Sequence, residues 1–163
     1  EGALDILDLG CGTGLTGRLL KSHAGRLDGV DLSKAMLEKA RTRKLYDRLV
    51  LAEIVSYLTE VEQEYDILVA GDVLAYFGNL SGILRGVARV LREGGVFAFT
   101  VEVHRGSRFL LTPSGRYAHA REYIRRLATS ARLREVSVGR AHLRYEYGDP
   151  VVGDIWILER LSR

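Results

Sequence analysis

The sequence predicts an α/β fold in which a parallel sheet is covered by helices on both faces. Short apolar runs alternate with segments of helical period through the first hundred residues, a pattern that strands joined by crossover helices produce. The first apolar run carries an acid and then breaks into glycines at alternate positions, in DILDLGCGTG from Asp5 to Gly14. The chain of 163 residues, 47% hydrophobic and 28% charged, is long enough to bury a core as one globular domain.

Strands are expected in the first hundred residues at 4–9, 27–31, 49–54, 66–70 and 96–101. Helices are expected between them at 14–23, 33–44 and 80–91. Ser33 stands before the second helix as a candidate N-cap, because its hydroxyl can accept a hydrogen bond from a free backbone N–H. The pair Gly94 and Gly95 is expected to end the third helix.

The alternation changes after Val101. Residues 104–118 contain two glycines and a proline and show no clear period, and a connection of that length is usually functional or mobile. A helix is expected at 120–131, followed by two runs at 133–147 and 151–161. The turn signal Gly148-Asp149-Pro150 joins these runs, so we expect them to close the fold as an antiparallel hairpin.

The glycine loop after the first strand indicates a cofactor. Such a loop gives a small ligand close access to the backbone, and the N-terminus of the next helix offers free N–H groups. Gly10, Gly12 and Gly14 read G-x-G-x-G, while Gly12, Gly14 and Gly17 read as the dinucleotide fingerprint G-x-G-x-x-G. Asp31 lies 19 residues beyond Gly12, where a carboxylate binds two ribose hydroxyls in either case. Spacing alone therefore leaves two cofactor classes open.

Two further acids favour a positively charged nucleoside. Asp8 lies inside the first strand, where a carboxylate repels a pyrophosphate and attracts an ammonium or sulfonium group. Asp72 repeats this charge at the end of the fourth strand. We expect Asp8 and Asp72 near the floor of a pocket and Asp31 at its rim, which suits S-adenosylmethionine better than NAD.

The chain resembles the class I S-adenosylmethionine-dependent methyltransferases in DLGCGTG, GVDLSKAMLEKAR, YDILVAGDVLAYFGNL and VLREGGVFAFTVE. The resemblance spans nearly the whole chain. Through AGDVLAYFGNL and TPSGRYAHAREYI, the chain is also similar to a bacterial group of predicted methyltransferases often fused to tetratricopeptide repeats. The resemblance implies a Rossmann-like, doubly wound sheet of seven strands in the order 3-2-1-4-5-7-6, with the last strand antiparallel. Transfer of a methyl group would leave S-adenosylhomocysteine as the product.

The resemblance also implies cofactor-binding roles at four strand ends. In the family, the first motif holds the methionine portion of the cofactor, and the residues that match it here are Asp8, Gly10, Cys11, Gly12 and Gly14. A second segment lies under the methionine tail, and Asp72 and Val73 match it. The ribose and adenine are bound by residues matched by Asp31, Leu32, Glu53 and Ile54. The residues that flank Glu53 depart from the usual pattern of the family.

Catalytic candidates lie beyond the fourth and fifth strands. A proton acceptor is needed when the methyl group goes to oxygen or nitrogen, and an imidazole with an ordinary pKa of about 6.5 serves near neutral pH. His119 is the first choice and His104 the second, while Tyr76 is expected to form an aromatic wall with Phe77. We expect residues 105–119 to form a lid over the substrate.

A small molecule is the expected methyl acceptor, with oxygen favoured over nitrogen or carbon. The segment Asp72 to Tyr76 lacks the prolines of enzymes that methylate nucleobase amines, and the paired glutamates that hold a guanidinium are missing. Three other functions stay open: a nicotinamide-dependent oxidoreductase, a non-catalytic cofactor-binding module of a larger protein, and an RNA methyltransferase. The last would use the ten arginines that face only two acids from His104 to Arg144, although a solvated helix surface explains them better.

The setting expected for the chain is the cytoplasm of a bacterium. Cys11 is the only cysteine, and neither an export signal nor a membrane span is visible. We expect a single domain over 1–163, to which a longer protein would add an N-terminal cap over the ligand loop. We assign no metal ligands, no membrane partner and no nucleic-acid partner, and we leave the oligomeric state open.

Overall fold

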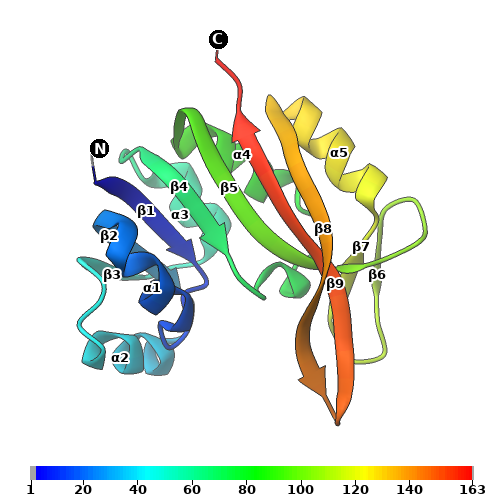
Figure 1. Cartoon of the computed structure of the whole chain (residues 1–163), viewed down its shortest axis with the longest axis horizontal. Helices are drawn as coiled ribbons and strands as arrows, with labels where there is room; N and C mark the ends of the chain where they lie inside the picture. Colours follow the sequence, from blue (N-terminus) through cyan, green and yellow to red (C-terminus); the bar gives the residue numbers. More distant parts are fainter. Residues whose placement is uncertain (1–2, 163) are drawn as a thin grey trace.

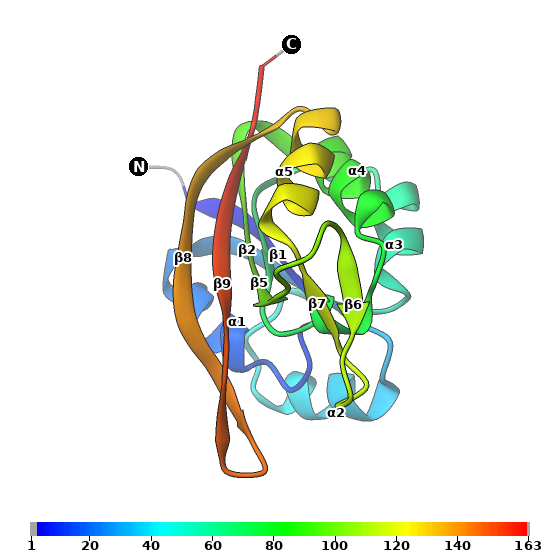
Figure 2. The same cartoon turned by 90° about the vertical axis from the view of Figure 1, so that its right-hand side faces the viewer.

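The computed structural model describes residues 3–162 and shows a mixed sheet with helices on both faces (Figures 1 and 2). The strands are β1 (Leu4–Leu9), β2 (Ala24–Asp31), β3 (Arg48–Leu51), β4 (Tyr65–Ala70), β5 (Leu91–Val103), β6 (Phe109–Leu111), β7 (Tyr117–His119), β8 (Leu133–Glu146) and β9 (Asp149–Arg160). The helices are α1 (Leu15–Leu20), α2 (Lys34–Thr42), α3 (Ile54–Glu60), α4 (Ser81–Val90) and α5 (Arg121–Ser130), with short 3₁₀ segments η1 (Lys21–His23) and η2 (Leu74–Tyr76).

The central sheet has the predicted strand order. Its main body runs β3-β2-β1-β4-β5-β9-β8, with parallel pairing from β3 to β5 and antiparallel pairing of β9 with both β5 and β8. The predicted order and the antiparallel last strand are therefore confirmed, while the sheet over the described residues has nine strands rather than seven. The two extra strands, β6 and β7, form a small hairpin that begins in the predicted connection 104–118 and ends one residue beyond it, and β7 pairs with the end of β5.

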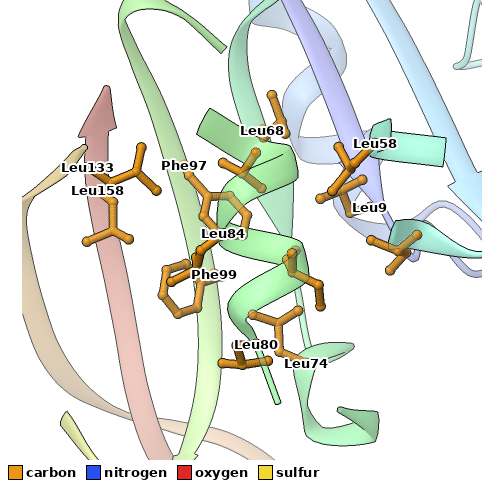
Figure 3. Packing of buried hydrophobic residues seen from close by; sticks show 14 of the residues in the cluster. Leu9, Leu58, Leu68, Leu74, Leu80, Leu84, Phe97, Phe99, Leu133 and Leu158 are labelled. Carbon is orange, nitrogen blue, oxygen red and sulfur yellow. The ribbon is translucent and has the colours of Figure 1, made fainter. Parts of the chain in front are cut away.

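The hydrophobic core lies between the sheet and the layer of helices α3, α4 and α5 (Figure 2). Figure 3 shows Leu84 of α4 over Phe97 and Phe99 of β5. The rings of Phe97 and Phe99 stack with centroids 4.6 Å apart, and the Trp156 ring lies 6.1 Å beyond Phe99. Dense packing of this kind resists displacement, so it fixes the ends of β4 and β5 at which the candidate site is built.

Three sequence predictions about element boundaries are wrong, each for a local reason. The third strand ends at Leu51 and not at residue 54, because Glu53 caps α3, an unpredicted helix, by accepting a hydrogen bond from Ser56 N at 2.9 Å. Gly94 and Gly95 do not end α4: the backbone is already extended at Leu91, and Gly94, at φ +74°, lies at an irregularity inside β5.

The third misplaced boundary is the turn of the C-terminal hairpin. Its two turn residues are Tyr147 (φ 50°) and Gly148 (φ 87°), and Asp149 and Pro150 belong to β9. Two successive positive φ values match the right-handed twist of the flanking strands. The hairpin itself is confirmed, and it extends beyond the rest of the sheet on the side where β1 and β4 end (Figure 1).

The predicted N-cap is confirmed. The Ser33 hydroxyl accepts a hydrogen bond from Met36 N at 3.3 Å, and α2 begins at the next residue. Within residues 3–162, no helix combines the length and the apolar character that crossing a membrane requires.

Candidate active site

The candidate site lies at the carboxyl ends of β1, β2 and β4, where parallel sheets bind ligands. Gly10, Gly12 and Gly14 carry the chain from β1 to α1 with φ values of +66°, +54° and +89°. Residues with a Cβ rarely adopt such values, so this loop depends on glycine. The sequence pattern located this loop correctly because it depends on local backbone geometry.

Gly10 also packs against the loop that follows β4. A Cβ at Gly10 would lie 2.8 Å from Val73 Cβ and closer still to one of its methyl groups. The two loops therefore touch through a glycine hydrogen and a valine side chain, which brings the ends of β1 and β4 together.

We expect Gly10→Ala to lower the free energy of unfolding by about 2–4 kcal/mol, from the clash with Val73 and the positive φ. Val73→Ala in the same chain should restore part of this loss, because it removes the clashing methyl groups and leaves only the backbone strain. Urea unfolding of the two single variants and the double variant measures the coupling. Strictly additive effects would show that the loops do not press on each other.

Asp31 organises the loop from the end of β2. Its Oδ2 accepts a hydrogen bond from Gly12 N at 2.9 Å, and its Oδ1 accepts one from Ser33 N at 2.8 Å. An ionised carboxylate has about four lone-pair sites, so both oxygens keep capacity for ribose hydroxyls. Asp31 thus links the glycine loop to the start of α2 while still facing a cavity.

A cavity of about 370 Å³ lies beside Asp31. Most of its walls are apolar, and the residues that line it are Gly10, Asp31, Leu32, Ser33, Ala52, Glu53, Ile54, Val73, Tyr76 and Phe77. The structure thus brings Asp31, Leu32, Glu53 and Ile54 together as expected. Burial raises the pKa of Glu53, but backbone N–H groups at the start of α3 outweigh this and hold the pKa below its ordinary value.

A second cavity of about 460 Å³ lies on the other side of Gly10. It runs from the glycine loop to the β8–β9 hairpin, and its lining is Gly10, Cys11, Gly12, Thr13, Leu15, Thr16, Gly71, Asp72, Thr100, His142, Leu143 and Ile155. Asp72 has a φ of 53°, and its backbone N donates to Thr100 Oγ1 at 2.9 Å. Backbone held in this conformation at a non-glycine residue often marks a functional position.

Asp8 corrects the expected picture of the pocket floor. Its side chain is buried, lines neither cavity and accepts a hydrogen bond from the Tyr46 hydroxyl at 2.6 Å. Burial raises the pKa of Asp8 to about 7, with the Tyr46 hydrogen bond opposing the rise. Asp8 therefore does not present a full negative charge to a ligand at neutral pH, and Asp31 and Asp72 are the aspartates that face the cavities.

Tyr46 is a residue that sequence reasoning missed. Its ring lies against Gly14, Gly17 and Gly29, so that a Cβ at any of these glycines would come within about 3 Å of it. The ring thus supports the loop from behind while its hydroxyl binds Asp8. No local pattern marks Tyr46, because its role depends on contacts with residues far away in the sequence.

The catalytic histidines expected from the sequence lie outside both cavities. His119 is fully buried on β7, its Nε2 lies 2.8 Å from the carbonyl oxygen of Phe77, and burial lowers its pKa. The ring of His104 packs over Gly106. The geometry therefore supports a structural role for both, since neither lines a cavity that an acceptor enters.

Tyr76 does line the cavity beside Asp31 and is 62% exposed. The guanidinium of Arg116 lies 5.6 Å from its ring centroid. This contact joins residue 116 of the expected lid to the edge of the cavity.

An ion-pair cluster joins the hairpin to the end of β4. Arg144 of β8 binds Asp72 at 2.5 Å, Glu146 at 2.9 Å and also Glu102 of β5. Arg116 lies 3.3 Å from Glu146 and 3.8 Å from Asp72. At least part of the arginine-rich stretch is thus paired with acids rather than presented as a basic surface.

Residues 7–97 match the family model of a methyltransferase domain, which is more than half of the chain. The chain belongs to the methyltransferase family. Of the two cofactors that the glycine spacing left open, the family decides for S-adenosylmethionine, and the sequence prediction of a methyltransferase is confirmed.

Two curated relatives of the methyltransferase act on oxygen according to their names. The present chain is 32% identical over 103 residues to the malonyl-[acyl-carrier protein] O-methyltransferase of Acetivibrio thermocellus, and the match covers 62% of this chain and 36% of that protein. It is 27% identical over 117 residues to the ubiquinone biosynthesis O-methyltransferase of Proteus mirabilis, covering 69% of this chain and 48% of that protein. The chain thus spans less than half the length of either relative.

The fold of the methyltransferase matches solved structures along its whole length. The magnesium protoporphyrin IX methyltransferase of Synechocystis, solved with bound S-adenosylmethionine, has a TM-score of 0.74 and 17% identity, covering 97% of this chain and 70% of that one. At this identity the likeness concerns the fold.

The residues of the methyltransferase fit a cationic nucleoside. The largely apolar cavity offers the Asp31 carboxylate at its edge, and the neighbouring cavity offers Asp72. Gly10 lines both cavities and allows a ligand close access to the backbone at the point where they meet. Each of the two cavities that share Gly10 thus has one aspartate in its lining, Asp31 in the first and Asp72 in the second.

Proposed function

We propose that the methyltransferase transfers a methyl group from S-adenosylmethionine to an oxygen atom of a small molecule. The observation that carries this proposal is the pair of cavities that share Gly10. The cavity beside Asp31 suits the nucleoside, and the cavity below the β8–β9 hairpin has room for the methionine portion and an acceptor.

Each group of residues has a task in this proposal. Asp31 accepts hydrogen bonds from the ribose, Leu32 and Ile54 flank the adenine, and Glu53 lies where it can accept from the adenine amine. The glycine loop, Cys11 included, and Asp72 with Val73 hold the methionine portion. Bound S-adenosylmethionine supplies a methyl group on a positively charged sulfur, which reacts with a nucleophile in line.

Tyr76 and Phe77 form one wall of the cavity near Gly10. Aromatic faces attract a cation and exclude water, so this wall favours the charged cofactor. Positioning of the two reactants and removal of water are the main contributions that a protein makes to such a displacement.

Oxygen and a small acceptor follow from two lines of support. The two relatives named above are O-methyltransferases, and the prolines typical of nucleobase-amine methylation are absent from residues 72–76. A cavity of about 460 Å³ suits a small molecule or the end of a flexible carrier-bound group. As part of the same proposal, the protein works in the reducing cytoplasm of a bacterium, which suits its single cysteine, Cys11. The similarity to methyltransferases fused to tetratricopeptide repeats suggests that such repeats lie beside this domain in a longer protein.

Calorimetry with S-adenosylhomocysteine and with NAD tests the cofactor, and we expect binding of the first alone. Methyl transfer to malonyl-[acyl-carrier protein] and to a small phenol then tests the oxygen acceptor, with product detected by mass spectrometry. Preferential binding of NAD would overturn the proposal. Steep salt-dependent binding of RNA by the same chain would instead favour an RNA acceptor.

A further inference from the structure

We propose that His142 is the general base that accepts the proton of the methyl acceptor. This inference rests on the function proposed above and names the residue that completes its chemistry. His142 lies on β8 and lines the cavity that also holds Thr13, Asp72 and Thr100.

The placement of the four histidines singles out His142. His119 is buried and held by the carbonyl oxygens of Phe77 and Gly78, while the His104 ring packs over Gly106. His23 is exposed on η1 and lines neither cavity. His142 is thus the histidine that the fold brings into a cavity at the glycine loop.

Arg144 holds the backbone of β8 at this cavity. It lies two residues beyond His142 and binds both Asp72 at the end of β4 and Glu102 on β5. The pairing of β8 with β9 shifts register between His142 and Arg144, so the strand is irregular where it carries His142. Arg144 is therefore a positioning residue, because it ties the strand that carries His142 to the cavity wall.

The other titratable groups of this cavity are less free than His142 to accept a proton. Asp72 faces the cavity from the end of β4 but is engaged by Arg144, and Arg116 lies 3.8 Å from it. Cys11 faces the cavity from the loop after β1, and burial raises the pKa of its thiol to about 12, which keeps it protonated. On β8 itself, the Tyr145 ring centroid lies 4.3 Å from that of His142.

The proton transfer completes the reaction without a further reactant. The acceptor oxygen forms a bond to the methyl carbon, the carbon–sulfur bond breaks, and its electron pair stays on sulfur. His142 accepts the proton of the acceptor's hydroxyl group as the oxygen–methyl bond forms. The exposed imidazole then releases this proton to water. Atoms and charges balance, since the positive charge of the sulfonium leaves as the proton.

The placement of His142 can be tested without any acceptor. S-adenosylmethionine and S-adenosylhomocysteine differ by the methyl group and one positive charge on sulfur. A unit charge within about 8 Å of an imidazole disfavours its protonation by about 0.4 pH units even in water. We expect NMR titration of His142 to have a lower midpoint with S-adenosylmethionine bound than with S-adenosylhomocysteine, and His23 to titrate identically with both.

The chemistry is tested with His142→Gln and the matched control His23→Gln on a phenol acceptor, because its hydroxyl carries a proton, whereas a malonyl carboxylate is already ionised at pH 7 and needs no base. We expect His142→Gln to bind S-adenosylhomocysteine within about twofold of wild type. Its methyl-transfer rate at pH 7 should fall by about 100-fold or more. The increase of the rate with pH that wild type shows as the base loses its proton should also be absent. His23→Gln should keep the wild-type rate and pH profile.

The outcomes separate the two proposals. Failure of the wild-type chain to bind S-adenosylhomocysteine overturns the proposed function and this inference with it. Binding with the same His142 titration for both ligands overturns the assignment of His142 alone. A wild-type rate and pH profile in His142→Gln does the same.

Discussion

Asp31→Ala is expected to weaken binding of S-adenosylhomocysteine by at least about 100-fold. The carboxylate accepts hydrogen bonds from Gly12 N and Ser33 N and lines the nucleoside cavity, so its removal affects both the ligand and the loop. Hydrogen bonds to a charged group contribute about 1.5–3 kcal/mol each, and the loss of two ribose contacts alone reaches this factor. We therefore expect this substitution to have the largest effect on the cofactor.

Titration calorimetry measures this loss, and two variants show its origin. Asp31→Asn keeps one oxygen acceptor and is expected to bind with intermediate affinity. Asp149→Ala removes an exposed carboxylate at the start of β9, away from both cavities, and should bind as wild type. Retention of wild-type affinity by Asp31→Ala would show that the nucleoside lies elsewhere.

The thermal shift gives a second measure of the same prediction. A ligand at 100 times its dissociation constant stabilises the folded state by about 2.7 kcal/mol, and this gain falls to about 0.4 kcal/mol when affinity falls 100-fold at fixed ligand concentration. Unfolding of Asp31→Ala without ligand shows how much of the effect comes from the loop itself.

Features that depend on neighbouring residues were predicted well from the sequence. The three glycines need positive φ, Ser33 caps the helix that follows it, and Asp31 ends an apolar run. Each of these follows from the backbone within a few residues. The alternation of strands and helices predicted a parallel sheet covered on both faces, whereas the order of its strands was implied by the resemblance to the class I methyltransferases.

Features that depend on tertiary packing were not predictable in this way. Tyr46 binds Asp8 across 38 positions of sequence, and only the folded chain shows that this contact turns the acid away from the cavities. His142 reaches the glycine loop because a long hairpin extends past the sheet, whereas His119 is drawn into the core beside Tyr123. Short sequence patterns carry no signal for either outcome, because both depend on where distant parts of the chain meet.

Replacement of Asp8 by asparagine is expected to stabilise the folded chain at pH 8 and to have little effect on stability at pH 4. Burial raises the pKa of Asp8 from 3.8 to about 7, so the folded state binds a proton that the unfolded state releases between these values. Where the folded state binds more protons, stability falls as pH rises, by about 1.4 kcal/mol per pH unit for one group. The full difference between pH 4 and pH 8 is then about 4 kcal/mol, and asparagine at this position has no charge to bury.

Urea unfolding of wild type and Asp8→Asn at pH 4 to 8 measures this difference, and comparing the two chains cancels the titration of other groups, including buried His119. Tyr46→Phe provides the matched test of the cause. The Tyr46 hydroxyl opposes the rise in the pKa of Asp8, so its loss should extend the fall in stability to pH values above 7. Parallel pH profiles for wild type and Asp8→Asn would mean that Asp8 stays ionised, and the acid would then present its charge to the cofactor loop after all.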